Sequence, residues 1–377
     1  MRTVVTGQIG IDKKPYLEAI VNRAGERGRE IPLFNVGKMM YAEGPDIHPG
    51  RILDLPLSRL ASLRRAAFKD IISRTKPEDE YPEILVNTHA TFRWHHGLFS
   101  AFDFDQVSEL KANMFICLLD NIEVVHHRLH AEHDIDATLK DCMVWREEEI
   151  IVTEMLANAM GCQNEFYILS RGRHKDTVET ALRLVTRPEL RKVYPSFPMS
   201  HVMDMPDILA EIEHFRSELA NHFITFDPAD VDEKLLLDRG LAAAAEGSDW
   251  IDVEPHSFGG RADAEPVKVS VREILDIAGD VDGQIYMRDF KLIDQSDMIV
   301  SLVPELAGGI PGLSSGVERE LHHAFEHTKE VYVVWKPKKN PSPFITETAT
   351  RIFSSVDEAL AYFGDEGMFH PGDLFGH

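Results

Sequence analysis

Cysteine is scarce in this sequence, and its arrangement excludes both a disulfide framework and a cysteine-based metal site. The chain has three cysteines, none of them in a C-x-x-C pair: Cys117, Cys142 and Cys162. Few thiols in apolar or helical surroundings are typical of a reducing compartment. In the histidine run HHRLHAEH, residues at i and i+3 share a helix face, but the one at i+6 drifts from it. We therefore expect a solvated helix there and no metal site.

Long apolar runs and an excess of positive charge are also absent. No segment approaches the roughly 20 apolar residues that cross a bilayer, and MRTVVTGQIG has no signal-peptide pattern. Lys and Arg number 40 against 63 Asp and Glu, which gives a formal net charge of −23. A surface this acidic repels phosphate backbones. We expect a cytoplasmic protein that binds neither membrane nor nucleic acid.

Two series of alternating strand-like and helix-like segments fill the 377 residues. Pro188 ends a predicted helix in VTRPELRKVYPSFPMS, and a new series begins after it. Alternation of this kind favours an α/β fold in which helices cover both faces of a parallel sheet. We predict two such doubly wound domains, residues 1–188 and 189–377. The segment 246–268, rich in Gly, Pro and Asp, is expected to be a long surface loop.

These elements are predicted from apolar runs and helical periodicity. The expected strands are Thr3–Thr6, Pro32–Val36, Glu83–Asn87, Met114–Leu119, Glu165–Leu169, Lys192–Ser196, Phe223–Phe226, Met298–Val303 and Val331–Trp335. The expected helices are Pro15–Arg27, Leu57–Ser73, Ile122–Ala131, Arg146–Met160, Lys175–Val185, Pro206–Ala220, 231–245, 269–278, Arg288–Gln295 and Ser315–Thr328.

The first domain opens with a degenerate phosphate-binding loop, VVTGQIGIDKKPYLEAI. In the pattern G-x-x-x-x-G-K-[ST], glycines let backbone N–H groups wrap phosphates, the lysine neutralises them and the hydroxyl holds magnesium. Gly7 and Lys13 fit, and Gly10 is a further glycine of the turn. Asp12 stands where the second glycine belongs, and Lys14 stands where the hydroxyl belongs. Gly7, Gly10 and Lys13 are the expected nucleotide-binding residues.

Residues 1–187 resemble the archaeal type of adenylate kinase, chiefly in ILVNTHATFRW, NMFICLLDNIEVVHHRL and WREEEIIVTEMLANAMGCQNEFYIL. The resemblance implies a P-loop kinase fold, with ATP or another nucleotide as partner. Asn87 replaces the family's magnesium-holding carboxylate, and the lid stretch RLHAEHDID is poor in arginine. Phosphoryl transfer needs cations over the transferred group. These departures favour a domain kept for binding, regulation or assembly, with a kinase of unusual metal use as the alternative.

A second motif, GLSSGVERELHHA at 312–324, joins a small-residue turn to a predicted helix. Ser315 and Glu318 have the spacing of a capping box. The predicted buried stripe consists of Val317, Leu321, Ala324 and Phe325. Glu320 lies at the border of this stripe, in the first turn after a predicted strand. Two interpretations stay open: an ordinary helix cap, or a carboxylate presented to a substrate at the carboxyl end of a strand.

The segment 285–337 resembles the nucleoside 2-deoxyribosyltransferase superfamily, and 192–219 is similar to its opening strand and helix. The matching positions are Asp289, Asp297, Ser314, Gly316 and Glu320, with Tyr194 near the nucleophile. The resemblance implies a flavodoxin-like sheet and a glutamate nucleophile, Glu320, that attacks C1′ of a nucleoside or nucleotide. It also implies that Asp297 assists the sugar hydroxyl or leaving base and that Asp289 supports the site.

Ser314 resembles the branch of deoxynucleoside 5′-monophosphate N-glycosidases, in which this serine helps to form a phosphate pocket. That branch uses an arginine that PSFPMSH lacks, and Ser196, Ser200 and His201 are the available substitutes. The substrate-binding residues implied are Tyr194, Ser314, Gly316 and Ser200. No cofactor is implied.

The sequence thus predicts an N-glycosidase that acts on a nucleoside or nucleotide and carries a kinase-like domain for binding, regulation or assembly. Members of this superfamily often complete their sites across a subunit interface, so a homo-oligomer is expected by analogy. The alternatives are a non-catalytic nucleotide-binding or scaffold protein, and a nucleotide kinase.

Overall fold

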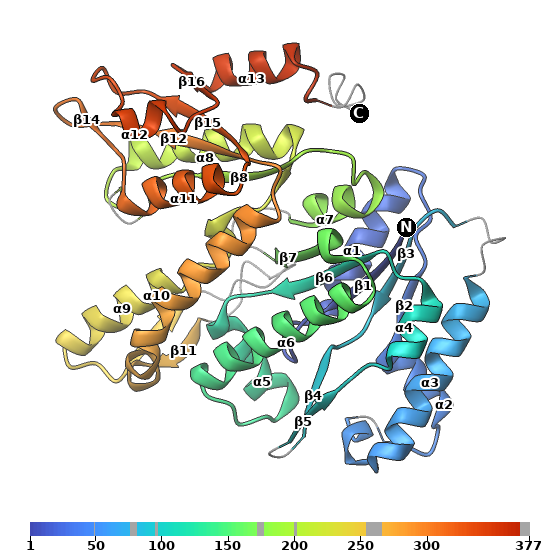
Figure 1. The fold of residues 1–377 in the computed structure, drawn as a ribbon. Helices are drawn as coiled ribbons and strands as arrows, with labels where there is room; N and C mark the ends of the chain where they lie inside the picture. The colour runs from blue at the N-terminus through green and yellow to red at the C-terminus, as the bar shows by residue number, and fades with distance from the viewer. Residues whose placement is uncertain are drawn as a thin grey trace. The chain divides into compact units, whose positions relative to one another are not determined.

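The computed structural model describes residues 1–48, 50–75, 81–94, 97–171, 177–199, 202–253 and 266–369 (Figure 1). It divides into two compact units. Met1–Thr186 and Val231–Val281 form the first, whereas Arg187–Asp230 and the described chain from Asp282 onward form the second. Within the described ranges, no helix is long and apolar enough to cross a membrane.

A five-stranded parallel sheet with the order β2-β3-β1-β6-β7 forms the centre of the first unit. Its strands are β1 Arg2–Thr6, β2 Leu33–Asn35, β3 Ile84–Asn87, β6 Met114–Leu119 and β7 Phe166–Ser170. The central strand β1 places Val4 opposite Val86 of β3 and Phe115 of β6. All residues of β3 and β6 are buried, as expected for strands covered on both faces.

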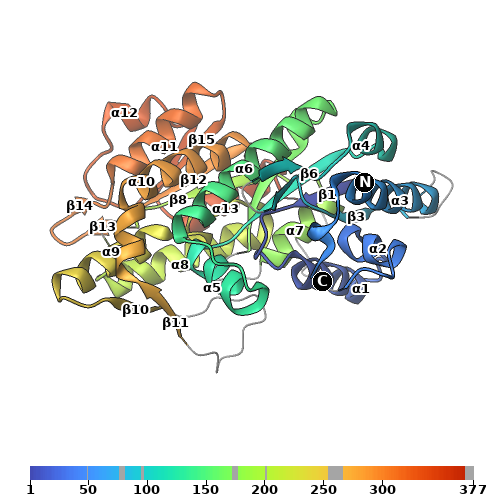
Figure 2. The same cartoon turned by 90° about the horizontal axis from the view of Figure 1, so that it is seen from below.

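Helices cover both faces of this sheet (Figure 2). The helices of this part are α1 Lys13–Glu26, α2 Val36–Glu43, α3 Leu57–Arg74, α4 Phe104–Leu110, α5 Ile122–His133, α6 Leu139–Ala159 and α7 Thr177–Thr186, with short 3-10 turns at Ile52–Asp54 and Gln163–Glu165. Helices α3, α4 and α6 share an apolar cluster with Val4, Val86 and Phe115, and α1 and α7 lie on the opposite face. A hairpin, β4 Thr91–Trp94 and β5 Gly97–Ser100, completes the segment.

Helix α6 begins seven residues earlier than the sequence predicts. Thr138 and Asp141 form a capping box in which each side chain bonds the other residue's backbone N–H. The reciprocal bonds satisfy two N–H donors of the first turn, which fixes the start of the helix at Leu139. The extra turns matter because α6 carries Glu149 into the candidate site.

Residues 231–281, assigned to the second domain in the sequence analysis, group with the first unit instead. They form α9 Glu233–Ala245, the hairpin β10 Trp250–Val253 with β11 Val267–Ser270, and the start of α10 Val271–Asp294. A buried ion pair between Arg146 of α6 and Glu233 of α9 joins this segment to the first unit. Alternating exposed and buried residues explain the two strands that flank the expected loop at 246–268, of which residues 254–265 lie outside the described residues.

The second unit contains another five-stranded parallel sheet, with the order β16-β15-β12-β8-β9. Its strands are β8 Lys192–Ser196, β9 Ile224–Thr225, β12 Met298–Val303, β15 Glu330–Trp335 and β16 Arg351–Phe353, and a small ladder joins β13 Glu305–Leu306 to β14 Ile310–Pro311. Its helices are α8 Pro206–His222, α11 Ser315–Glu326, α12 Pro343–Thr346 and α13 Val356–Asp365, with a 3-10 turn at Pro228–Asp230. The predicted α/β class with parallel sheets is confirmed.

The direction of strand addition reverses between β8 and β12 in this second sheet. Helices α8 and α13 pack into one apolar cluster with Val193, Val300 and Val334, whereas α11 packs on β12 and β15 through other residues. In open parallel sheets, ligands bind at the carboxyl ends of the strands where the order reverses. A ligand site in this sheet is therefore expected at the carboxyl end of β8.

Candidate functional site

The loop between β1 and α1 keeps positive φ angles at its two glycines in spite of its departures from the phosphate-loop pattern. Gly7 (φ 148°) and Gly10 (φ 84°) are both in the region that favours glycine. A Cβ at Gly7 would lie 3.0 Å from the Leu118 carbonyl oxygen, so a larger residue would clash there. Asp12 is left-handed as well, with φ 59° and ψ 52°. Because aspartate tolerates this region better than most residues, Asp12 replaces the second glycine without altering the turn.

Two buried arginines hold the outer side of this loop. Arg128 donates to the Ile11 carbonyl at 3.1 Å and to Asp120 at 2.9 Å. Arg171 donates to the same carbonyl and lies 3.6 Å from the Asp120 carboxylate. Since the C=O and N–H of a trans peptide point in opposite directions, the Asp12 N–H points away from the arginines. The network thus orients a backbone donor toward the inner side of the loop.

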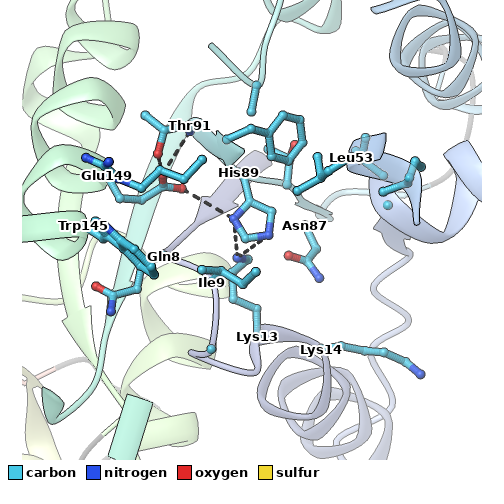
Figure 3. A pocket seen from close by; sticks show the side chains of 18 of the residues that line it. Gln8, Ile9, Lys13, Lys14, Leu53, Asn87, His89, Thr91, Trp145 and Glu149 are labelled. Carbon is cyan, nitrogen blue, oxygen red and sulfur yellow. Dashed lines mark hydrogen bonds and ion pairs between the residues drawn. The ribbon is translucent and has the colours of Figure 1, made fainter. Parts of the chain in front are cut away.

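Lys13, the first residue of α1, is buried beside this loop. Its Nζ donates to the Gly7 carbonyl at 2.7 Å and lies 3.2 Å from both ring nitrogens of His89 (Figure 3). Burial lowers the pKa of Lys13 to about 8, although the charge of Glu149 opposes this shift. Burial and the Lys13 ammonium hold the pKa of His89 well below its usual range. At neutral pH, a neutral histidine ring therefore faces a charged lysine.

Glu149 of α6 is a buried carboxylate that fastens the loop to the strand ends, and the sequence analysis did not single it out. It accepts hydrogen bonds from Gly7 N at 3.2 Å, Ala90 N at 2.8 Å and Thr91 N at 3.0 Å, and from the Thr91 hydroxyl. Only the acidic run in WREEEI signalled it, and that run gives no reason to prefer the third glutamate. Glu149 engages the Gly7 N–H, and within the loop the Ile11 N–H bonds the Gln8 carbonyl at 3.4 Å.

A cavity of about 330 Å³ lies in front of the loop. Residues from α2, α3, α6 and the β4–β5 hairpin complete its lining, among them Met40, Arg64, Phe92, Arg93 and Trp145. Such a volume and a largely apolar lining are typical of small-ligand pockets. The Arg93 guanidinium lies 5.6 Å from the Trp145 ring centroid and pairs with Glu148, so both residues position this side chain.

The residues at the magnesium-holding positions do not fit a metal ion held by the protein. Lys14 takes the place of the hydroxyl, is exposed and lies 3.8 Å from Glu18. Asn87 lines the cavity with a neutral amide where the resemblance expects a carboxylate. The Glu149 carboxylate is already engaged by backbone donors. The positive charges that line the cavity are instead those of Lys13, Lys14, Arg64 and Arg93.

In the second unit, Glu320 of α11 lies against the end of β8. The Ser196 hydroxyl donates to Glu320 Oε2 at 2.6 Å, and Ser196 is the last residue of that strand. Burial raises the pKa of the Glu320 carboxyl, while the hydroxyls of Ser196 and Tyr194 lower it. Burial, followed by the charges of Asp289 and Glu320, raises the pKa of Tyr194 well above its usual range. The structure thus brings together Glu320, Ser196, Tyr194 and Asp289.

Asp297 lies at the other end of the same sheet. Its Oδ2 accepts a hydrogen bond from Lys192 N at 2.8 Å, at the first residue of β8. Ser196 is four residues further along, which corresponds to roughly 13 Å in an extended strand. The predicted assistance of Asp297 beside Glu320 does not fit this placement. A residue that directly precedes a parallel strand is at the amino edge, whereas the site lies at the carboxyl edge.

Helix α11 begins at Ser315 as predicted, but its capping residue differs from the prediction. Its N-cap is Ser314, whose hydroxyl accepts from Val317 N at 3.1 Å, so the predicted capping box at Ser315 is wrong. The Ser314 side chain is engaged in this cap, and Gly316 is exposed and has no steric need to be glycine. The other predicted substrate-binding residue, Ser200, lies outside the described residues.

The stripe of α11 is narrower than predicted. Val317, Leu321 and Ala324 are buried as expected, but Phe325 is 48% exposed. Glu320 is half-buried, in agreement with its predicted position at the border of core and solvent.

A family model matches part of the first half of the chain. Residues 6–141 match this model, which is described as an AAA domain. Adenylate kinase from Pyrococcus furiosus is 27% identical over 189 residues, which cover 48% of this chain and 92% of that protein. A shikimate kinase from Bacteroides thetaiotaomicron aligns with 48% of this chain and 94% of its own, at 11% identity and a TM-score of 0.31. The N-terminal half is a kinase-like P-loop domain similar to adenylate kinase.

Proposed function

We propose that the first unit binds an adenine nucleotide with its phosphates on the Gly7–Lys13 loop and acts as a nucleotide kinase. The observation that carries this proposal is the backbone of the loop. Three left-handed residues, Gly7, Gly10 and Asp12, precede a lysine at the start of a 14-residue helix. The N-terminus of such a helix favours anions because its first N–H groups have no partner within the helix.

Lys13 and Arg64 would have separate tasks in this reaction. An incoming phosphate would compete with the Gly7 carbonyl and the His89 ring for the Lys13 ammonium, and a neutral His89 offers little resistance. Arg64 lines the same cavity, with one bond to the Ser100 carbonyl at 3.3 Å. Its guanidinium is suited to the phosphate of an acceptor nucleotide, since planar cations bind phosphates in a bidentate manner. This fixed positive charge substitutes in part for the arginine-poor lid.

A direct assay tests the proposal. The full chain is incubated with ATP, magnesium and each of the common nucleoside monophosphates, and the diphosphates formed are separated by chromatography. Diphosphate formation with at least one acceptor is the expected result. Calorimetric ATP binding without any transfer would contradict the kinase activity and leave a binding domain. The absence of both binding and transfer would contradict the whole proposal.

Nucleotide affinity is expected to fall with rising pH above about 8. Lys13 attracts phosphate only as an ammonium, and its pKa in the ligand-free protein is about 8. Between pH 8 and pH 9 the protonated fraction of Lys13 drops, so ATP affinity should fall by about fivefold. Affinity should be nearly constant from pH 6.5 to 7.5. Calorimetry across this range measures the effect, and a Lys13→Met variant should have no such slope.

Replacement of Asp12 with glycine is expected to strengthen ATP binding by about tenfold. The exposed Asp12 carboxylate makes no capping bond to α1 and repels phosphate at close range, and at an effective dielectric near 20 a charge of this kind contributes about 1–3 kcal/mol. Glycine also adopts the left-handed conformation without strain. Asp12→Asn is the matched control, because it removes the charge and keeps a residue that tolerates this backbone. Equal gains in ATP affinity for both variants would show that the effect comes from the charge. If neither variant gained affinity, the phosphates would have to bind away from this loop.

A second candidate function belongs to the second unit, for which we propose cleavage of an N-glycosidic bond by Glu320. The cluster at the end of β8 supports it: a half-buried carboxylate, a serine donor at 2.6 Å and a buried tyrosine hydroxyl, at the point where strand order reverses. The test is the release of free base from a panel of ribo- and deoxyribonucleosides and their monophosphates. The resemblance to the deoxyribosyltransferase superfamily remains a prediction from sequence.

A further inference from the structure

We propose that Asp294, His323 and His327 bind a divalent transition-metal ion, for which Zn²⁺ is the probe. The three residues each offer one ligand atom, and these atoms lie within 4.8 Å of one another. Asp294 is the last residue of α10, whereas the histidines lie at the end of α11 and just beyond it. This inference does not depend on either proposed activity.

The two histidines have the spacing and orientation that a metal ion requires. Residues four apart in a helical segment lie on the same face, and the rings of His323 and His327 are 4.0 Å apart. His323 Nε2 is 2.7 Å from Asp294 Oδ1, so the carboxylate and the first imidazole already meet. Ligand atoms around a tetrahedral zinc ion lie about 3.3 Å apart, which small side-chain rotations would achieve here.

Neighbouring groups hold both imidazole rings in place. The His323 ring stacks on Phe290 of α10 with centroids 4.1 Å apart and 5° between the planes. His327 Nδ1 lies 2.9 Å from the His323 carbonyl, so this bond leaves Nε2 for an ion. A backbone carbonyl that binds the second nitrogen is the usual support of a metal-ligating histidine. Both histidines therefore already have neighbours that fix the orientation of their rings.

The ligand set selects the class of ion. Two imidazoles and one carboxylate suit zinc and neighbouring transition metals, whereas calcium and magnesium prefer oxygen ligands alone. Lys329 also lies at this end of α10, but its ammonium donates to the carbonyls of Asp294 and Ser296 rather than to the carboxylate. With three protein ligands, a fourth position would remain for water.

The ion would join the ends of α10 and α11. These are the helices that carry Asp289 and Glu320, so a bound ion would fix the distance between the elements that supply the candidate carboxylates. Glu320 precedes His323 by one helical turn, and Asp289 precedes Asp294 by five residues. The proposed ion is thus a structural clamp beside the second site and does not touch Glu320.

Zinc titration of the full chain after removal of metal with EDTA tests the site. Calorimetry should show a binding event that is weakened at least about tenfold in His327→Asn and in Asp294→Asn. His327 and Asp294 are exposed, so their replacement should leave the packing of His323 on Phe290 intact. Zinc should also raise the unfolding temperature of the wild type more than that of either variant, because a ligand of the native state stabilises it.

His322→Asn is the matched control. His322 is exposed on the same helix and its Nε2 lies 3.3 Å from Glu326, away from the proposed ligands. This variant should bind zinc as the wild type does. Equal zinc affinity in the wild type and His327→Asn would overturn the proposal, as would an equal loss in His322→Asn or no zinc binding by the wild type.

Discussion

Replacement of Lys13 with methionine is expected to weaken ATP binding by about 10- to 100-fold. A hydrogen bond to a charged group contributes about 1.5–3 kcal/mol, and a loss of about 2.7 kcal/mol corresponds to a factor of 100 in the dissociation constant. Methionine keeps most of the length and the apolar stem of the buried side chain. Burial lowers the pKa of Lys13 to about 8, so the charged form of this side chain is less favourable in the folded protein than in water. The variant should therefore unfold at a temperature equal to or above that of the wild type.

Lys14→Met is the control for this variant. Lys14 is adjacent and carries the same charge at the edge of the same cavity, but it is exposed and lies 3.8 Å from Glu18. Its loss removes equal net charge without altering the bonds between Lys13, Gly7 and His89, so ATP affinity should change by less than about threefold, as for a screened surface charge. Similar losses in both variants would show that ATP responds to overall charge. An unchanged affinity in Lys13→Met would contradict the phosphate site.

Local pattern was sufficient to predict the loop but not its supports. Gly7 and Lys13 were recognised by their spacing, and Asp12 was recognised as a departure. Only the backbone angles show that Asp12 keeps the left-handed turn. Glu149 could not be predicted because its partners, Gly7 and Thr91, are 142 and 58 residues away in sequence. Bonds of this range exist only once the sheet has assembled.

In the second unit, too, the sequence predicted local elements better than the contacts between distant residues. Apolar runs predicted β8 and β12 with their observed bounds, and the helical wheel placed Glu320 at the core border. The resemblance assigned Asp297 a role beside Glu320, whereas its carboxylate bonds Lys192 N at the amino edge of the sheet, and a motif match does not say which edge a residue occupies. The grouping of 231–281 with the first unit depends on tertiary contacts such as the buried pair of Arg146 and Glu233.

Replacement of Glu320 with glutamine is expected to reduce base release by the second unit at least about 1,000-fold, a loss typical for a residue that forms the covalent intermediate. Attack on C1′ requires a carboxylate oxygen, which forms an ester with the sugar as the bond to the base breaks. A glutamine amide cannot form this ester, although its carbonyl can still accept from the Ser196 hydroxyl. The variant should therefore fold normally. Chromatography of the released base with the best substrate of the panel measures the effect.

Glu318→Gln separates the chemistry of Glu320 from the charge of the helix. Glu318 is exposed in the first turn of the same helix, two residues before Glu320, so both variants lose one negative charge near the helix N-terminus. Only Glu320 is bonded to Ser196 at the end of β8. Base release should be nearly unchanged in Glu318→Gln. Equal rates of base release in the wild type and Glu320→Gln would show that Glu320 is not the nucleophile. A wild type that releases no base would contradict the glycosidase, while nucleotide binding by the first unit would stand, since it depends on separate residues.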